Sequence, residues 1–279
     1  MMDKAQQSMY EFTSTGRTLD PRYPTNLAIM VITPVAGIIA GILSLLAGET
    51  FNEAIRAGFF TGASTFLAWA LAREFDPDHE LAAFLGAFLA FAASLFAAPP
   101  SIWPLGAMIV LARIVNRTVG PPAKIGDGIA SLIFTGLAII SGWWVFGIVA
   151  AAAYVLDVVL PTPNRKMGVF AALALIGMFV FIIVNQASKP YAEFTWWPVV
   201  LVASLGIAWV IFNTKVYAPC DIPTYRLTTL RVQATMGMML FAAIIFALWA
   251  GNAGVIALLP LWMMMVGISG WRIWEIAKA

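Results

Sequence analysis

The densest group of residues able to do chemistry is the acidic segment 73–80, which reads Arg-Glu-Phe-Asp-Pro-Asp-His-Glu. Carboxylate oxygens are the ligands that Mg²⁺ prefers, but one short segment cannot complete its octahedral shell. Acids from later loops would have to supply the rest. The predicted metal ligands are Asp76, Asp78, Glu80, Asp127 and Asp157.

Such an ion would hold a lipid-linked phosphate or diphosphate, and basic residues would bind its oxygens through charge-assisted hydrogen bonds. The predicted phosphate ligands are Arg117, Arg165 and Lys166. Together these residues would form the site of a membrane-embedded enzyme at the cytoplasmic interface. Mg²⁺ is the one cofactor considered, and only under this interpretation.

Helix capping explains the same acids without a metal. Asp76 or Asp78 would complement the start of the helix that follows, and Asp127 would do the same for a later helix. The chain has one histidine and one cysteine, which excludes an internal disulfide, a thiolate cage and two-histidine haem ligation. No nucleophile–base motif is visible, so an enzyme is the less favoured interpretation.

A transport site would need polar groups inside the membrane. No ionisable residue lies near the middle of a predicted span, which argues against proton relays and charged-ring channels. A cavity lined by uncharged polar groups suits a permease or exporter for a small neutral or lipophilic solute. The predicted cavity residues are Thr33, Ser64, Thr65, Thr135, Asn185 and Ser204.

The composition indicates the elements that must position these residues. The chain has 279 residues, of which 61% are hydrophobic and 11% charged. Soluble domains carry about 45–50% apolar and about 25% charged residues. This chain has too little charge to cover a water-facing surface, so the composition predicts an all-α, polytopic integral membrane bundle.

Ten apolar stretches approach the length that crosses about 30 Å of hydrocarbon. The predicted spans are 27–47, 55–72, 81–98, 102–115, 126–141, 143–160, 168–186, 196–213, 232–250 and 253–271. With the N-terminus inside, fourteen of the sixteen Lys and Arg residues fall on the cytoplasmic side, and Arg56 and Lys189 fall outside. Positive charge collects in cytoplasmic loops. This asymmetry predicts cytoplasmic N- and C-termini in a plasma membrane, specifically a bacterial or archaeal inner membrane.

Residues 1–26 are expected to form a frayed cytoplasmic tail, and residues 27–279 a single transmembrane domain. An inverted repeat would divide that domain into halves 27–141 and 142–271. The size and ten-helix plan resemble those of the drug/metabolite transporter group in overall layout. No motif carries this resemblance, and it implies no residue roles.

Small residues recur at a spacing of four in the first two spans. Gly37 and Gly41 lie in the first span, and Ala54, Gly58 and Gly62 lie in the second. Such stripes allow helix backbones to approach closely. They predict contacts with a second copy of the chain or with a membrane partner. Membrane lipids are the other expected partners, and the net charge of +2 is too small to suggest nucleic acid.

Three functions stay open from the sequence. Several predicted spans contain a proline, which bends a helix: Pro34, Pro104, Pro198 and Pro260. Such kinks favour a permease or exporter, and the acidic segment favours a membrane enzyme acting on a lipid-linked phosphate. The uncharged interior suits a non-catalytic membrane subunit or scaffold of a larger complex. A polar cavity at mid-depth would favour transport, whereas convergence of the five carboxylates would favour the enzyme.

Overall fold

The computed structural model describes residues 9–187 and 192–278, and Lys189 lies outside them. The described chain is helical apart from turns, loops and one isolated bridge between Pro219 and Arg226. Its long helices are α2 (Pro24–Leu46), α3 (Phe51–Phe75), α4 (Ala82–Ser94), α5 (Ile102–Asn116), α6 (Ile125–Ile140), α7 (Phe146–Val159), α8 (Met167–Asn185), α9 (Trp197–Asn213), α10 (Thr229–Ala257) and α11 (Leu259–Lys278). The predicted all-α architecture is therefore confirmed for this part of the chain.

Among the described residues, three helices are long and apolar enough to cross a membrane: α2, α8 and α10. Five shorter helices, α4 to α7 and α9, are also apolar. Many large hydrophobic side chains remain exposed along α2, α8 and α9. An exposed apolar surface of this extent is typical of a protein that lies in lipid. The structure thus supports membrane localisation.

The first eight helices coincide with the first eight predicted spans to within a few residues. The boundary between the last two helices differs from the predicted one at residues 251–252, because α10 extends to Ala257 and α11 begins at Leu259. The expected break is nevertheless present inside α10, where Gly251 leaves helical geometry with φ 57° and ψ −135°. Residues 252–257 form a short helical piece that folds back, since a Cβ at Gly254 would overlap the carbonyl oxygen of Phe246.

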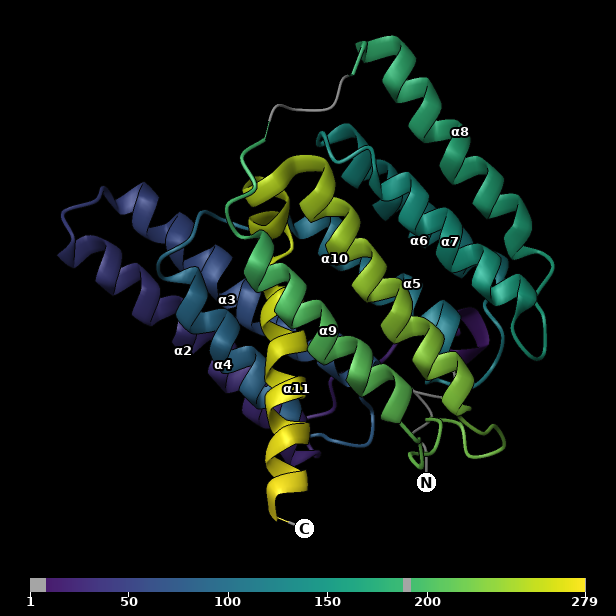
Figure 1. Ribbon diagram of the computed structural model, residues 1–279. Helices are drawn as coiled ribbons and strands as arrows, with labels where there is room; N and C mark the ends of the chain where they lie inside the picture. Colours follow the sequence, from purple (N-terminus) through teal and green to yellow (C-terminus); the bar gives the residue numbers. More distant parts are fainter. Residues whose placement is uncertain (1–8, 188–191, 279) are drawn as a thin grey trace.

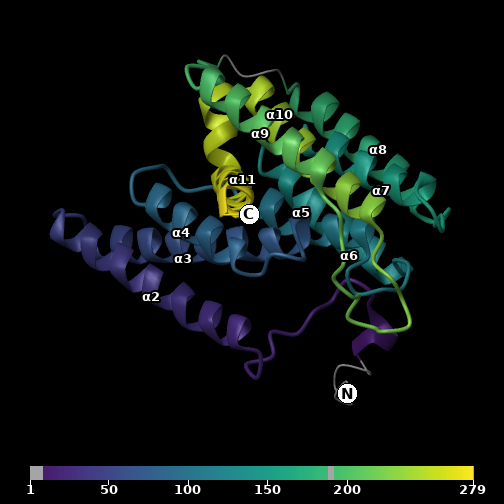
Figure 2. The ribbon, with the colours of Figure 1, turned by 60° about the horizontal axis from the view of Figure 1, so that its bottom comes forward.

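The glycine stripes of the first two spans bring α2 and α3 together. A Cβ at Gly37 would lie 2.9 Å from the carbonyl oxygen of Gly58, and a Cβ at Gly62 would lie 3.1 Å from that of Thr33. The predicted close approach is therefore present within one chain. Association with a second chain through the same faces stays a prediction. Figures 1 and 2 show α2 and the start of α3 as an arm that extends to one side of the bundle.

The remaining helices pack across the middle of the sequence. Helix α11 lies against α3 and α4, while α5 lies against α7 and α10 (Figure 1). These contacts cross the expected join at Ser141-Gly142. The core is made of buried aromatic and aliphatic side chains, among them Tyr154, Phe146 and Phe246. One face of this core, where α3, α5 and α7 end, carries the charged groups described next.

Candidate functional site

The first charged group surrounds Glu74, in the last turn of α3. Its side chain is fully buried. The carboxylate accepts hydrogen bonds from Arg113 Nε at 2.8 Å, Arg17 Nη1 at 3.2 Å and Thr118 Oγ1 at 2.7 Å. Asn116 Nδ2 donates to it at 3.1 Å. Because four donors meet a buried carboxylate, this group joins α3, α5 and the N-terminal segment.

The second charged group surrounds Asp157, in the last turn of α7. Its Oδ1 accepts from Arg117 Nη2 at 2.7 Å and from Arg231 Nη1 at 2.9 Å. The two guanidinium groups are themselves nearly buried. Arg117 also donates to Thr162 Oγ1 at 2.9 Å, and both of these residues have positive φ. Two arginines on one acid leave an excess of positive charge beneath the surface.

Residues 10–17 of the N-terminal segment are held against the bundle by hydrogen bonds and an ion pair. This corrects the expectation that the whole tail is frayed. The Asp127 carboxylate accepts hydrogen bonds from the hydroxyl groups of Thr13, Ser14 and Thr15. Lys124 Nζ donates to the carbonyl oxygen of Tyr10 at 2.7 Å. Asp127 is only 2% exposed, so water cannot supply its hydrogen bonds and the three hydroxyl groups supply them instead. The N-terminal segment is held in place for this reason. Residues 1–8 of the expected tail lie outside the described residues.

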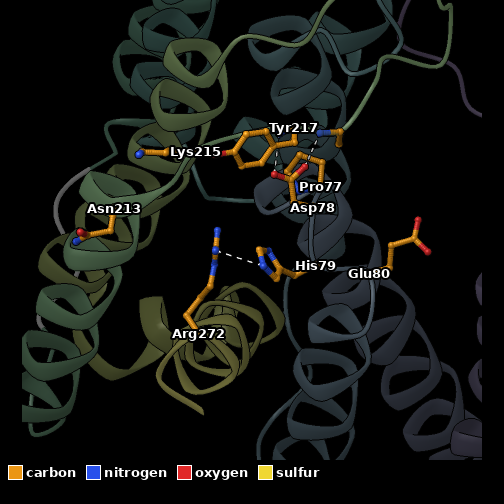
Figure 3. A pocket seen from close by; sticks show the side chains of 9 residues that line it. Pro77, Asp78, His79, Glu80, Asn213, Lys215, Tyr217 and Arg272 are labelled. Atoms are coloured by element: carbon orange, nitrogen blue, oxygen red, sulfur yellow. Dashed lines mark hydrogen bonds between the residues drawn. The ribbon is translucent and has the colours of Figure 1, made fainter. Parts of the chain in front are cut away.

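An open pocket of about 630 Å³ lies where the α3–α4 loop meets α9 and α11 (Figure 3). Its walls come from the α3–α4 loop, the end of α9 with the segment that follows, and the last part of α11. The lining residues are Pro77, Asp78, His79, Glu80, Asn213, Lys215, Tyr217, Ala218 and Arg272. Elements far apart in the sequence therefore surround one polar space.

The acids of the pocket already have partners. Asp78 accepts from the backbone N–H groups of Tyr217 at 2.9 Å and Ala218 at 2.6 Å. Glu80 forms an ion pair with Arg73 at 2.8 Å. By contrast, no carboxylate pairs with Lys215 among the described residues. Lys215 is therefore the cation of this lining that no described carboxylate pairs with, while Asp78 keeps its negative charge because backbone N–H groups do not neutralise a carboxylate.

Arg272 on α11 and His79 in the α3–α4 loop face each other in the pocket lining (Figure 3). Arg272 Nε donates to Asp76 Oδ2 at 2.9 Å and Nη2 donates to Asp76 Oδ1 at 3.4 Å, so this carboxylate holds the guanidinium in place. Arg272 Nη1 lies 3.3 Å from His79 Nε2. His79 Nδ1 lies 3.0 Å from Asp76 Oδ1, and Nε2 lies 3.2 Å from Glu275 Oε2. The hydrogen bond to Asp76 raises the pKa of His79 above its ordinary value. Protonation would add positive charge to this part of the lining.

The five acids predicted as metal ligands lie in separate surroundings. Asp76, Asp78 and Glu80 stay near the pocket with different partners, while Asp127 binds the N-terminal segment and Asp157 binds two arginines. The described residues contain no group of three or more His, Cys, Asp or Glu side chains able to hold a metal ion.

The predicted phosphate ligands are also apart from the pocket. Arg117 is engaged with Asp157, and Arg165 and Lys166 are exposed just before α8.

The six residues predicted for a transport cavity lie on five helices and outside the pocket. Four of them donate to carbonyl oxygens of their own helices: Ser64, Thr65, Thr135 and Asn185. The hydroxyl groups of Thr33 and Ser204 are buried and have no hydrogen-bond partner in the described structure. Thr33 lines an apolar groove of about 660 Å³ between α2 and α3.

Sequence reasoning missed Lys215 and Arg272 as candidate ligands. From the sequence, both residues are explained by the expected excess of positive charge on the cytoplasmic side, and nothing further singles them out. Arg272 meets Asp76 across 196 positions of sequence, and no local spacing indicates such a contact. The sequence offers one weak indication of this site, because the polar residues Asn213 and Lys215 lie close together at the end of an apolar span.

Comparison with protein-family models, with curated proteins and with solved structures finds no match to this chain.

Proposed function

We propose that this protein works at the cytoplasmic surface of a membrane, where it binds a negatively charged, phosphate-bearing ligand in the pocket between α9, α11 and the α3–α4 loop. The observation that carries the proposal is the position of Lys215. Lys215 lines the pocket without a carboxylate partner among the described residues, and Arg272 lines the same pocket. Of the neighbouring acids, Asp78 accepts from backbone N–H groups and Glu80 pairs with Arg73. Asp76 pairs with Arg272 itself, so Lys215 is the cation that is free to meet a ligand.

The chemistry of these groups suits phosphate. A lysine ammonium and an arginine guanidinium donate charge-assisted hydrogen bonds to phosphate oxygens. Ligand pockets commonly enclose about 300–1,000 Å³, and this pocket of about 630 Å³ falls within that range. The proposal keeps the ligand class of the membrane-enzyme interpretation. It assigns that ligand to Lys215 and Arg272 in place of Arg117, Arg165 and Lys166.

Replacing Lys215 by glutamine is expected to weaken binding of glycerol 3-phosphate by about tenfold, because one charge-assisted hydrogen bond at an open site contributes roughly 1.4 kcal/mol. Isothermal titration calorimetry on the purified protein in detergent measures the change. Lys166→Gln is the matched control, since this lysine is exposed and lies outside the pocket. Equal affinities of wild type and Lys215→Gln, or a loss confined to Lys166→Gln, would contradict the proposal.

We further infer that the ten helices cross the plasma membrane with both termini in the cytoplasm, as the distribution of Lys and Arg favours. Under this topology, positions 122 and 163 share one side and Ser141 lies on the other. Single cysteines at these positions, in a Cys220→Ser background, are expected to react with a membrane-impermeant maleimide from those sides. Labelling of positions 122 and 163 from opposite sides of sealed vesicles would refute the topology.

Transport of a small neutral or lipophilic solute is the second candidate function. The buried, unpaired hydroxyl groups of Thr33 and Ser204 favour it, because a polar group in an apolar surrounding is costly unless a partner uses it. Solute release from loaded liposomes tests this candidate. Unchanged release after adding the protein would remove it.

A further inference from the structure

One face of α9 leads from the apolar part of the molecule into the pocket. Leu205, Trp209 and Asn213 follow one another at a spacing of four, so they lie along the same side of the helix. Leu205 is 63% exposed and Trp209 is 42% exposed. Asn213 ends the helix and lines the pocket. An exposed apolar stripe therefore reaches the polar site directly.

The opposite face of α9 is turned into the bundle. Val200, Ile207 and Val210 are buried there, and α9 packs against α10 and α11. The Leu205–Trp209 stripe consequently faces outward, where a membrane-embedded chain meets lipid. Tryptophan prefers the level of the lipid headgroups, which places the adjoining pocket at the same level.

The charges of the pocket fit a lipid at that level. Basic pockets between helices on the cytoplasmic side of a membrane bind anionic headgroups. Lys215 and Arg272 supply the positive groups, and Asn213 stands between them and the apolar stripe in sequence. A soluble ligand would use the pocket alone. A ligand with a hydrocarbon chain would use the pocket and the stripe together.

We propose that the ligand is an anionic glycerophospholipid, with its phosphate at Lys215 and Arg272 and one acyl chain along the Leu205–Trp209 stripe. This inference rests on the proposed function and names the substrate class of the same site. The lipid enters sideways from the bilayer, because the stripe and the pocket are continuous along α9. The phosphate supplies the negative partner that Lys215 lacks among the described residues, and the acyl chain replaces other lipid on an already exposed surface.

The test compares four probes on the purified protein in detergent: phosphatidylglycerol, phosphatidylcholine with the same chains, glycerol 3-phosphate and a polyprenyl phosphate. Phosphatidylglycerol is expected to bind at least about tenfold more tightly than each of the other three. Equal binding of phosphatidylcholine, or tightest binding of the polyprenyl phosphate, would overturn the inference. If glycerol 3-phosphate binds as tightly as phosphatidylglycerol, the inference fails while the proposed function stands. If no probe binds, both fail.

The stripe is tested with Leu205→Ser, and Leu173→Ser on α8 is the matched control because that leucine is also exposed. Leu205→Ser is expected to reduce the preference for phosphatidylglycerol over glycerol 3-phosphate by about fivefold, and the control to leave it unchanged. A fluorescence measurement covers the case of poor folding. Phosphatidylglycerol with brominated chains should quench wild type more than Trp209→Phe, and equal quenching would overturn the inference.

Discussion

Asp157→Asn is expected to lower the free energy of unfolding by about 3–5 kcal/mol, the usual cost of removing one partner from a buried ion pair. Arg117 and Arg231 keep their charges in the variant, and their side chains are only 7% and 4% exposed. An amide oxygen accepts a hydrogen bond but does not neutralise two guanidinium groups. The ends of α5, α7 and α10 would lose their common partner.

Thermal unfolding in detergent, followed by circular dichroism and calibrated against denaturant titration, measures this loss. Asp20→Asn is the matched control, since Asp20 pairs with a single arginine, Arg22, whose side chain is 69% exposed, and the substitution should change stability much less. Arg231→Gln in the Asp157→Asn background should restore part of the loss, because one uncompensated charge is removed. A variant as stable as the wild type would show that the buried cluster does not stabilise the bundle.

Gly251→Ala is expected to destabilise the protein by at least about 2 kcal/mol, from backbone strain and from overpacking together. Gly251 has φ 57° and ψ −135°, a combination that L side chains rarely adopt. A Cβ at this position would overlap the carbonyl oxygen of Glu193, which accepts the N–H of Asn252 at 2.9 Å. The substitution therefore disrupts the turn between the two apolar helices.

Two glycine variants separate the causes. Gly142 has a positive φ, and a Cβ there would meet open space. Gly142→Ala should therefore lower the free energy of unfolding by about 1 kcal/mol from backbone conformation alone. Gly237→Ala lies inside α10 with open space and should stabilise the helix by about 0.5–1 kcal/mol. Chemical denaturation of the three variants gives the comparison. Gly251→Ala no less stable than Gly142→Ala would argue against a tight turn at this point.

The helices follow from local properties of the chain. A run of apolar residues buries its backbone polar groups in its own hydrogen bonds, so the amino-acid order indicates where helices begin and end. The glycine stripes of α2 and α3 likewise indicate close backbone contact. They do not indicate whether the contact joins two helices of one chain or two chains. The structure decides for an intrachain contact at Gly37 and Gly58.

For the candidate site too, the sequence determines some features and the tertiary structure the others. The sequence determined that acids gather at residues 73–80 and that basic groups stand at helix ends, because charge is costly inside a membrane. Only the tertiary structure decided that Asp78 meets the backbone after α9 and that Arg272 meets Asp76. Helix formation depends on neighbours a few positions away. A pocket depends on how distant helices cross, and residue spacing carries no record of that.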